Sequence, residues 1–138
     1  FNEGLMDVES RRALLRFSKN PNDTDDYLVS LGGLLKVQDH GTFNVRVTYV
    51  PDALLLDVSS LHHYLRTLSH SPAITPEQSG KTLLEDANNE LVPRWIRITL
   101  ISRPEGEKVG SYRCLFQDSQ PNWSNSELTA AVVEFETA

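Results

Sequence analysis

The chain has 138 residues, 39% of them hydrophobic, which fits one globular domain with a packed core. Its net charge of −6 argues against nonspecific nucleic-acid binding, because such binding depends on Lys and Arg neutralising phosphates. No apolar run is long enough to cross a bilayer, and residues 1–4 lack the pattern of a signal peptide. We therefore expect a cytoplasmic protein that binds neither nucleic acid nor membrane. Cys114 is the only cysteine, so no disulfide can form within the chain.

The first third of the chain predicts a short helix followed by a β-hairpin. Residues 7–17 are expected to be helical, and residues 19–23 have the turn chemistry of a loop. A strand is expected over residues 27–31, interrupted at Gly32 and Gly33 and continued over residues 34–37. After a turn at residues 39–41, apolar and polar residues alternate over residues 43–49, which is typical of a half-buried strand.

Two helices and two further strands are expected next. Residues 61–68 place apolar side chains at i, i+3, i+4 and i+7, and Ser59 or Ser60 is a suitable cap. Thr75, Pro76 and Gln78 form a capping-box pattern that opens a second helix, which Pro93 ends. Strands are expected over residues 96–100 and 109–116, joined by a turn at residues 104–106.

The predicted order is strand, strand, helix, helix, strand, strand. Two antiparallel hairpins flanking a helical pair form an α+β layer, with a four-stranded antiparallel sheet and both helices on one face. The tail contains another apolar run, residues 127–135, which predicts an edge strand or a contact with a partner.

Several short motifs occur in one order along this pattern. They are Asp26-Tyr27-Leu28-Val29, Tyr49-Val50-Pro51-Asp52, residues 57–65, Thr75-Pro76-Glu77 and Val92-Pro93-Arg94-Trp95. Over residues 26–116 the chain resembles the tunnelling-fold family, and most of all the NADPH-dependent 7-cyano-7-deazaguanine (nitrile) reductases of the queuosine pathway. The resemblance implies a tunnelling-fold domain at residues 26–118, preceded by an N-terminal helix and linker at 1–25 and followed by a tail at 119–138. It also implies self-association through sheet edges into a ring, or membership of a larger protein assembly.

The resemblance implies three ligand-binding residues. Glu77 falls where the family has a glutamate that anchors the guanine-like edge of a deazapurine or pterin, because a carboxylate offers two acceptors to neighbouring N–H donors. A Glu in the first turn of a helix also favours the helix dipole without any ligand. Asp57 and Ser60 fall in a family motif that contacts the cofactor, although Asp57-Val58-Ser59 is also a helix-capping stretch, which is the interpretation we favour.

The catalytic residues of the resembled family are missing. Nitrile reduction there requires a cysteine thiolate, placed between the first two strands, that adds to the nitrile carbon. Residues 32–41 contain no cysteine, and Cys114 is expected to be a small buried hydrophobe in the last strand. Ser59 replaces a lysine of the cofactor motif, and residues 103–107 place two acids in the family's phosphate-contacting turn. We expect no catalytic residues and no nitrile-reductase activity.

Two functional hypotheses of different classes follow. The first is a catalytically degenerate tunnelling-fold protein that acts as an oligomeric structural or ligand-binding subunit and needs no cofactor. The second is an enzyme of queuosine, deazapurine or pterin metabolism with an altered site, and only this alternative would use NADPH. No metal site is expected, because the histidines have no nearby cysteine and the adjacent His62 and His63 point in different directions on a helix.

Overall fold

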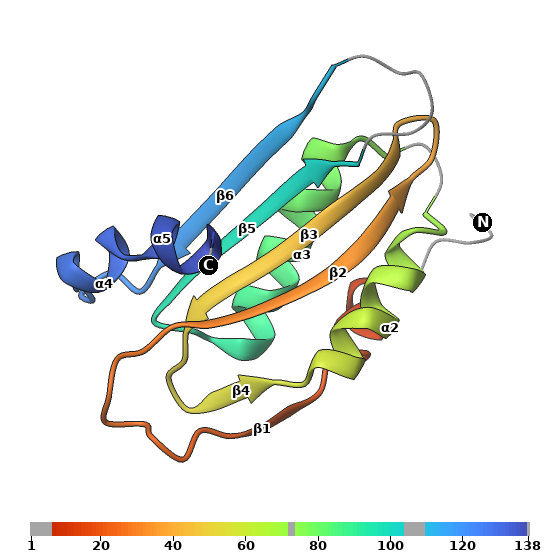
Figure 1. The fold of residues 1–138 in the computed structure, drawn as a ribbon. Helices are drawn as coiled ribbons and strands as arrows, with labels where there is room; N and C mark the ends of the chain where they lie inside the picture. The colour runs from red at the N-terminus through yellow and green to blue at the C-terminus, as the bar shows by residue number, and fades with distance from the viewer. Residues whose placement is uncertain (1–6, 72–73, 104–109, 138) are drawn as a thin grey trace.

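A computed structural model describes residues 7–71, 74–103 and 110–137, and its main feature is a four-stranded antiparallel sheet covered on one face by two helices (Figure 1). The strand order is β2-β3-β5-β6. The strands are β2 (Val29–Val37), β3 (Gly41–Val50), β5 (Trp95–Ser102) and β6 (Arg113–Ser119). The expected α+β arrangement of two hairpins around a helical pair is confirmed.

Helices α2 (Val58–Leu68) and α3 (Pro76–Leu91) bury the apolar face of the sheet. Helix α2 lies along β2, and α3 lies along β5 and β6. Alternate residues of each strand point to this face, where Val47, Ile98 and Leu100 are completely buried. They meet Leu61 and Leu65 of α2, and this layer is the main core of the protein.

A second, two-stranded sheet lies at the end of the helical layer where α2 begins (Figure 1). Strand β1 (Phe17–Lys19) pairs antiparallel with β4 (Leu54–Leu56), so that Phe17 lies opposite Leu56. The helix expected over residues 7–17 is therefore shorter than predicted. Helix α1 covers only Val8–Arg12, because the following residues are taken up by pairing with a strand distant in sequence.

The strand expected to break at Gly32 and Gly33 is instead continuous. Strand β2 runs through both glycines with an unbroken register against β3. A Cβ atom at position 33 would lie only 2.6 Å from Leu65 Cδ1, so the absence of a side chain at Gly33 lets α2 pack closely against the strand.

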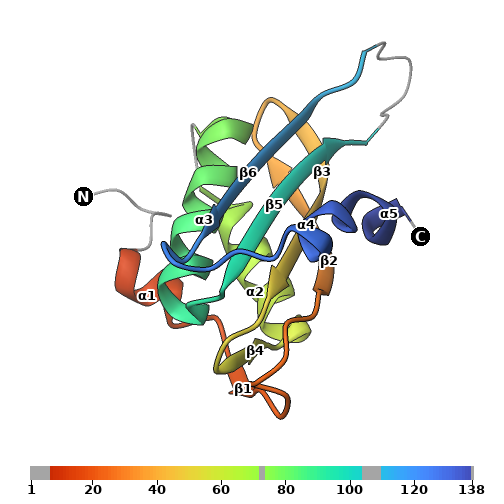
Figure 2. The same ribbon diagram turned by 90° about the vertical axis from the view of Figure 1, so that its left-hand side faces the viewer.

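The tail forms two short helices across the open face of the sheet rather than an edge strand (Figures 1 and 2). These are α4 (Ser126–Ala130) and α5 (Val132–Thr137). Val132 is buried against Val50 and Trp95, and Glu136 accepts hydrogen bonds from Thr48 at 2.6 Å and Arg97 at 3.3 Å. The prediction failed because a short apolar run does not distinguish a strand from a helix.

Strand β6 begins later than the sequence indicated, at Arg113 rather than residue 109. The turn expected at residues 104–106 lies outside the described residues. Helix α3 ends as predicted before Pro93, and Val92 takes a left-handed conformation with φ 48° at its C-cap.

Candidate functional site

Glu77 stands in the first turn of α3, at a helix start that the local sequence fixes. The Thr75 hydroxyl accepts a hydrogen bond from the Gln78 N–H at 3.1 Å, and the Gln78 side chain accepts one from the Thr75 N–H at 3.0 Å. The expected capping box is therefore present, with Pro76 at the first helical position. This arrangement leaves the Glu77 side chain exposed at the positive end of the helix.

Tyr112 holds the Glu77 carboxylate. The tyrosine hydroxyl donates a hydrogen bond to Glu77 Oε2 at 2.5 Å. Tyr112 is fixed in turn, because its N–H donates to the Ser102 hydroxyl at 2.9 Å and its ring packs edge-on against Phe43, with centroids 5.6 Å apart. Among the described residues Glu77 Oε1 has no hydrogen-bond partner, so the carboxylate is oriented while one oxygen stays available.

The phenol of Tyr112 is a donor and not a phenolate. Burial raises its pKa above the ordinary value of tyrosine, and the hydrogen bond to Glu77 raises the pKa further. The Cys114 thiol also acts on this phenol, and the cysteine is half-buried rather than fully buried. Glu77, Tyr112 and Cys114 therefore form one polar cluster, which we call the Glu77 cluster.

Sequence reasoning found Glu77 but missed Tyr112 and the position of Cys114. Cys114 of β6 and Tyr112, which directly precedes that strand, lie on the side that faces α3, as the alternation of residues 112, 114 and 116 could have indicated. Whether Tyr112 and Cys114 lie near the N-terminal or the C-terminal end of α3 depends on the direction in which α3 crosses the sheet. No local sequence pattern specifies that direction.

Asp57 and Ser60 cap helix α2. Asp57 Oδ2 accepts a hydrogen bond from the Ser60 N–H at 2.9 Å, and the Ser60 hydroxyl donates to the Asp57 carbonyl at 2.8 Å. The same hydroxyl accepts from the Arg16 N–H at 3.0 Å, which ties the start of α2 to the N-terminal segment. The structure thus gives both side chains a capping role. They also line a small hollow of about 250 Å³ together with Arg16 and His63.

The structure does not bring Asp57 and Ser60 together with Glu77. Helix α2 starts directly after β4 and runs away from it. Helix α3 runs in the opposite direction, so its C-terminal part approaches β4 and its first turn lies at the far end (Figure 1). Asp57 and Ser60 therefore lie at one end of the helical layer and Glu77 lies at the other.

The described residues do not provide a metal site. No group of three or more His, Cys, Asp or Glu side chains is arranged to hold a metal ion in the described ranges. His62 is engaged instead, since its Nε2 donates to the Gly32 carbonyl at 2.9 Å. No helix within the described residues is both long and apolar enough to span a membrane.

The expected cofactor position lies in the hollow that Ser59 lines together with Arg16 and His63. Ser59, an uncharged and exposed side chain, stands where a lysine would neutralise a phosphate. Its neighbours Asp57 and Ser60 are occupied by helix capping. The altered turn at residues 104–107 lies outside the described residues.

The arrangement of sheet and helices defines the class of the protein. It is an α+β protein with the tunnelling fold: an antiparallel ββααββ sheet with both long helices on one face. A crystal structure of the archaeosine synthase QueF-Like, in the apo form, matches this chain with a TM-score of 0.50 and 18% sequence identity. The match covers 72% of this chain and 95% of that one. No protein-family model and no curated protein sequence matches the chain.

Proposed function

We propose that the protein is a ligand-binding subunit of the tunnelling-fold type that holds a guanine-like base, a deazapurine or a pterin, at Glu77. The observation that carries the proposal is the oriented carboxylate of Glu77, with one oxygen held by Tyr112 and the other without a partner among the described residues. The fold shared with an archaeosine synthase supports a deazapurine as one of the candidate ligands.

The chemistry of the Glu77 cluster suits such a base. The edge of a guanine-like ring presents a ring N–H and an amino group side by side, and a carboxylate accepts from both in a charge-assisted pair. Tyr112 fixes the carboxylate before the ligand arrives, so less conformational freedom is lost on binding. Glu77 stands in the first turn of α3, where the helix dipole favours acidic side chains.

The protein is proposed not to reduce nitriles. A covalent thioimide requires a thiolate placed at the nitrile carbon, and the segment that joins β2 to β3 has no cysteine. The base would therefore be bound and not converted. The proposed role as an assembly subunit is supported by the two edge strands of the sheet, β2 and β6, each of which pairs with one strand of the sheet within this chain.

Calorimetry tests the base-binding proposal. The wild-type protein is titrated with 7-cyano-7-deazaguanine, guanine and a pterin, and Glu77→Ala and Glu85→Ala are titrated in parallel. Glu85 is a matched control because it is also an exposed glutamate on α3, where it pairs with Lys81. We expect at least one base to bind wild type and Glu85→Ala, and to lose about tenfold or more in affinity with Glu77→Ala. If none of the bases binds wild type, the subunit role is purely structural.

An enzyme of deazapurine or pterin metabolism is the second candidate. The observation that favours it is the Cys114 thiol beside Tyr112, which places a potential nucleophile in the Glu77 cluster. Turnover of a bound base, abolished in Cys114→Ser while binding persists, would establish this alternative. Turnover of 7-cyano-7-deazaguanine with NADPH would overturn the proposal that the protein does not reduce nitriles.

A further inference from the structure

The face of the sheet opposite helices α2 and α3, which we call the open face, is basic. The four strands carry four basic residues, and the alternation of side chains places all of them on this face. They are Lys36, Arg46, Arg97 and Arg113. The one acidic residue of these strands, Asp118, lies on the helix side, where Asn88 of α3 donates to it at 2.9 Å. A chain whose net charge is −6 therefore presents a positive surface on this side.

The tail brings one carboxylate to this surface. Of the described carboxylates, only that of Glu136 on α5 forms an ion pair with a cation of the open face. The Arg97 guanidinium donates to Glu136 Oε1 at 3.3 Å, and the Thr48 hydroxyl donates to Glu136 Oε2 at 2.6 Å. The side chains of Arg97 and Glu136 are only 17% and 14% exposed. The middle of the open face therefore accepts an oxyanion, and Arg97 is the residue that holds it.

Glu136 leaves two donors beside it unused. The Nε–H of Arg97 and the hydroxyl of Thr99 are buried and have no hydrogen-bond partner among residues 7–71, 74–103 and 110–137. Thr99 follows Arg97 by two residues on β5, so both side chains project from the open face. Buried polar groups of native proteins are nearly always hydrogen-bonded. Two unpaired donors next to a bound carboxylate indicate that the site suits a ligand with more acceptor atoms than Glu136 provides.

Arg46 extends this site toward a hollow on the open face. It lies opposite Thr99 on β3, and it forms no ion pair with a described carboxylate. Together with Leu34 and Ile101 it lines a hollow of about 400 Å³. Gly32, which lies opposite Arg46 on β2, has no side chain to fill that space. The hollow can therefore accommodate the body of a ligand whose anionic group binds beside it.

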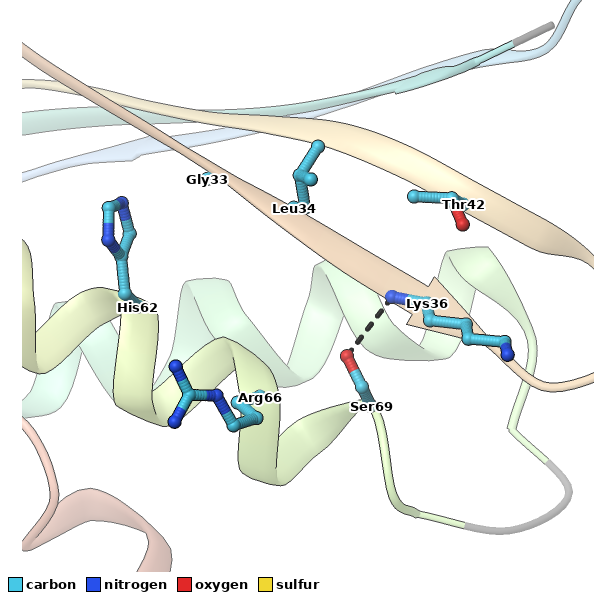
Figure 3. A pocket seen from close by; sticks show the side chains of 7 residues that line it. All are labelled: Gly33, Leu34, Lys36, Thr42, His62, Arg66 and Ser69. Carbon is cyan, nitrogen blue, oxygen red and sulfur yellow. Dashed lines mark hydrogen bonds between the residues drawn. The ribbon is translucent and has the colours of Figure 1, made fainter. Parts of the chain in front are cut away.

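The site lies on the inner strands of the sheet and not at an edge. Arg46 stands on β3 and Arg97 on β5, which are the two central strands. Lys36 stands apart, near the end of the edge strand β2, where its N–H donates to Ser69 Oγ at 3.0 Å (Figure 3). A site on the central strands remains accessible when the edge strands pair with other chains, as the proposed assembly requires.

Helix α5, which carries Glu136, is attached to the sheet by few contacts. It has six residues, of which only Val132 is buried, while Val133 and Phe135 are 65% and 40% exposed. The preceding helix α4 contains no buried residue. A helix this short is not stable without packing, so loss of the Glu136 contacts is expected to release it from the sheet.

We propose that Arg97, Thr99 and Arg46 form a binding site for a small ligand with a phosphate or carboxylate group, and that Glu136 occupies this site until the ligand replaces it. The two guanidinium groups would form charge-assisted hydrogen bonds with the anion, and the Thr99 hydroxyl would supply a further donor. Helix α5 would then act as a cover that the ligand displaces. The proposal goes beyond the binding of a base at Glu77 on the helix side and does not depend on it.

Calorimetry with inorganic phosphate and with citrate, at an ionic strength held constant with chloride, tests the site. We expect wild type to bind at least one of the two, and the anion that binds more tightly assigns the class of ligand. Glu136→Gln removes the competing charge and is expected to bind that anion about tenfold more tightly. Glu134→Gln makes the same change at an exposed position of α5 and is expected to bind like wild type. Arg97→Gln is expected to weaken binding about tenfold or more.

Two further measurements separate a binding site from a structural ion pair. Thr99→Val keeps the shape of the side chain and removes the unpaired hydroxyl, and a thermal melt verifies that the variant is folded. We expect it to bind the anion about threefold more weakly, an effect that a purely structural threonine would not produce. Hydrogen exchange of residues 132–137 in wild type is expected to become faster at a saturating anion concentration, because α5 leaves the sheet.

Three results would overturn the proposal. These are no binding of either anion to wild type, binding that either Arg97→Gln or Thr99→Val leaves unchanged, and hydrogen exchange of α5 that does not respond to the anion. Binding to Glu136→Gln alone would show that the ion pair only fastens the tail, and would also overturn it. Glu77→Ala is expected to leave phosphate and citrate binding unchanged, so this proposal and the one for base binding succeed or fail separately.

Discussion

Two of the four carboxylates of helix α3, Asp86 and Glu77, lie in opposite environments. Asp86 is completely buried and accepts hydrogen bonds from Arg11 at 2.5 and 3.0 Å, from Arg12 at 2.8 Å and from the Tyr64 hydroxyl at 2.5 Å. Glu77, in the first turn of the same helix, is exposed, and the one hydrogen bond that its side chain accepts from the described residues comes from Tyr112. Both oxygens of the Asp86 carboxylate are thus hydrogen-bonded, whereas the Glu77 carboxylate is held through one oxygen.

The difference gives Asp86 a structural role that Glu77 does not share. Burial opposes the ionisation of Asp86, but the hydrogen bonds from Arg11, Tyr64 and Arg12 outweigh it and hold the pKa of the carboxyl below its usual range. Because its partners come from α1 and α2, Asp86 fastens both helices to α3. Within the described residues the Glu77 carboxylate contacts Tyr112 through Oε2, and its Oε1 has no hydrogen-bond partner there.

The largest effect is expected for Asp86→Asn. An amide cannot neutralise the two guanidinium groups, so the variant is expected to lose about 3 kcal/mol of unfolding free energy, measured in urea. Glu85→Gln, the exposed neighbour on α3, is a control expected to change stability by less than about 0.5 kcal/mol. Equal losses in the two variants would show that the buried cluster does not act as a clamp.

Acid provides an independent measurement of the same cluster. The pKa of Asp86 is lower in the folded protein than in the unfolded chain, so its contribution is fully present above the unfolded value of about 3.9. That contribution is lost as the pH falls through the folded pKa. Wild type is therefore expected to approach Asp86→Asn in stability below about pH 4, and a constant difference between them down to pH 2 would contradict this assignment.

An intermediate effect is expected at Gly80, which lies between the two carboxylates on α3. A Cβ atom there would lie 2.6 Å from the Phe116 ring, so Gly80→Ala must displace that ring on β6. The cost of overpacking, about 2 kcal/mol, exceeds the gain of about 1 kcal/mol from replacing glycine in a helix. We expect a net loss of about 1 kcal/mol in urea unfolding, and a gain in stability would show that Phe116 moves freely.

The smallest effect on stability is expected for Glu77→Gln. The residue is exposed and loses only the charge on its hydrogen bond with Tyr112, so the unfolding free energy should change by less than about 0.5 kcal/mol. A loss comparable to that of Asp86→Asn would place Glu77 among the structural residues and remove the distinction between the two carboxylates.

The sequence predicts the elements well where the signal is local. The alternation over residues 43–49 and the capping box at Thr75 and Gln78 both correspond to what the structure contains. The errors occur where a distant contact decides the outcome. Phe17 pairs with Leu56 instead of extending a helix, and β2 passes through Gly33 because α2 packs directly against it.

The candidate site was predictable only in part. Glu77 could be located from its place in a motif, and Asp57 could be recognised as a cap from its position before a helix. The partners of Glu77 could not, because Tyr112 reaches it across 35 residues of sequence. Nothing in the sequence indicated that Asp86 is buried. Its burial depends on Arg11 and Arg12, and no local pattern shows that these two residues lie beside it.

The docking of the tail has a spectroscopic consequence. Both tryptophans of the chain, Trp95 and Trp123, belong to the small cluster that Val132 of α5 completes, and neither belongs to the main core. Trp95 is only 5% exposed and has the Arg97 guanidinium 5.4 Å from its ring centroid. The intrinsic tryptophan fluorescence of this protein therefore reports on whether α5 lies against the sheet, whereas unfolding of the main core must be followed through the backbone or the tyrosines.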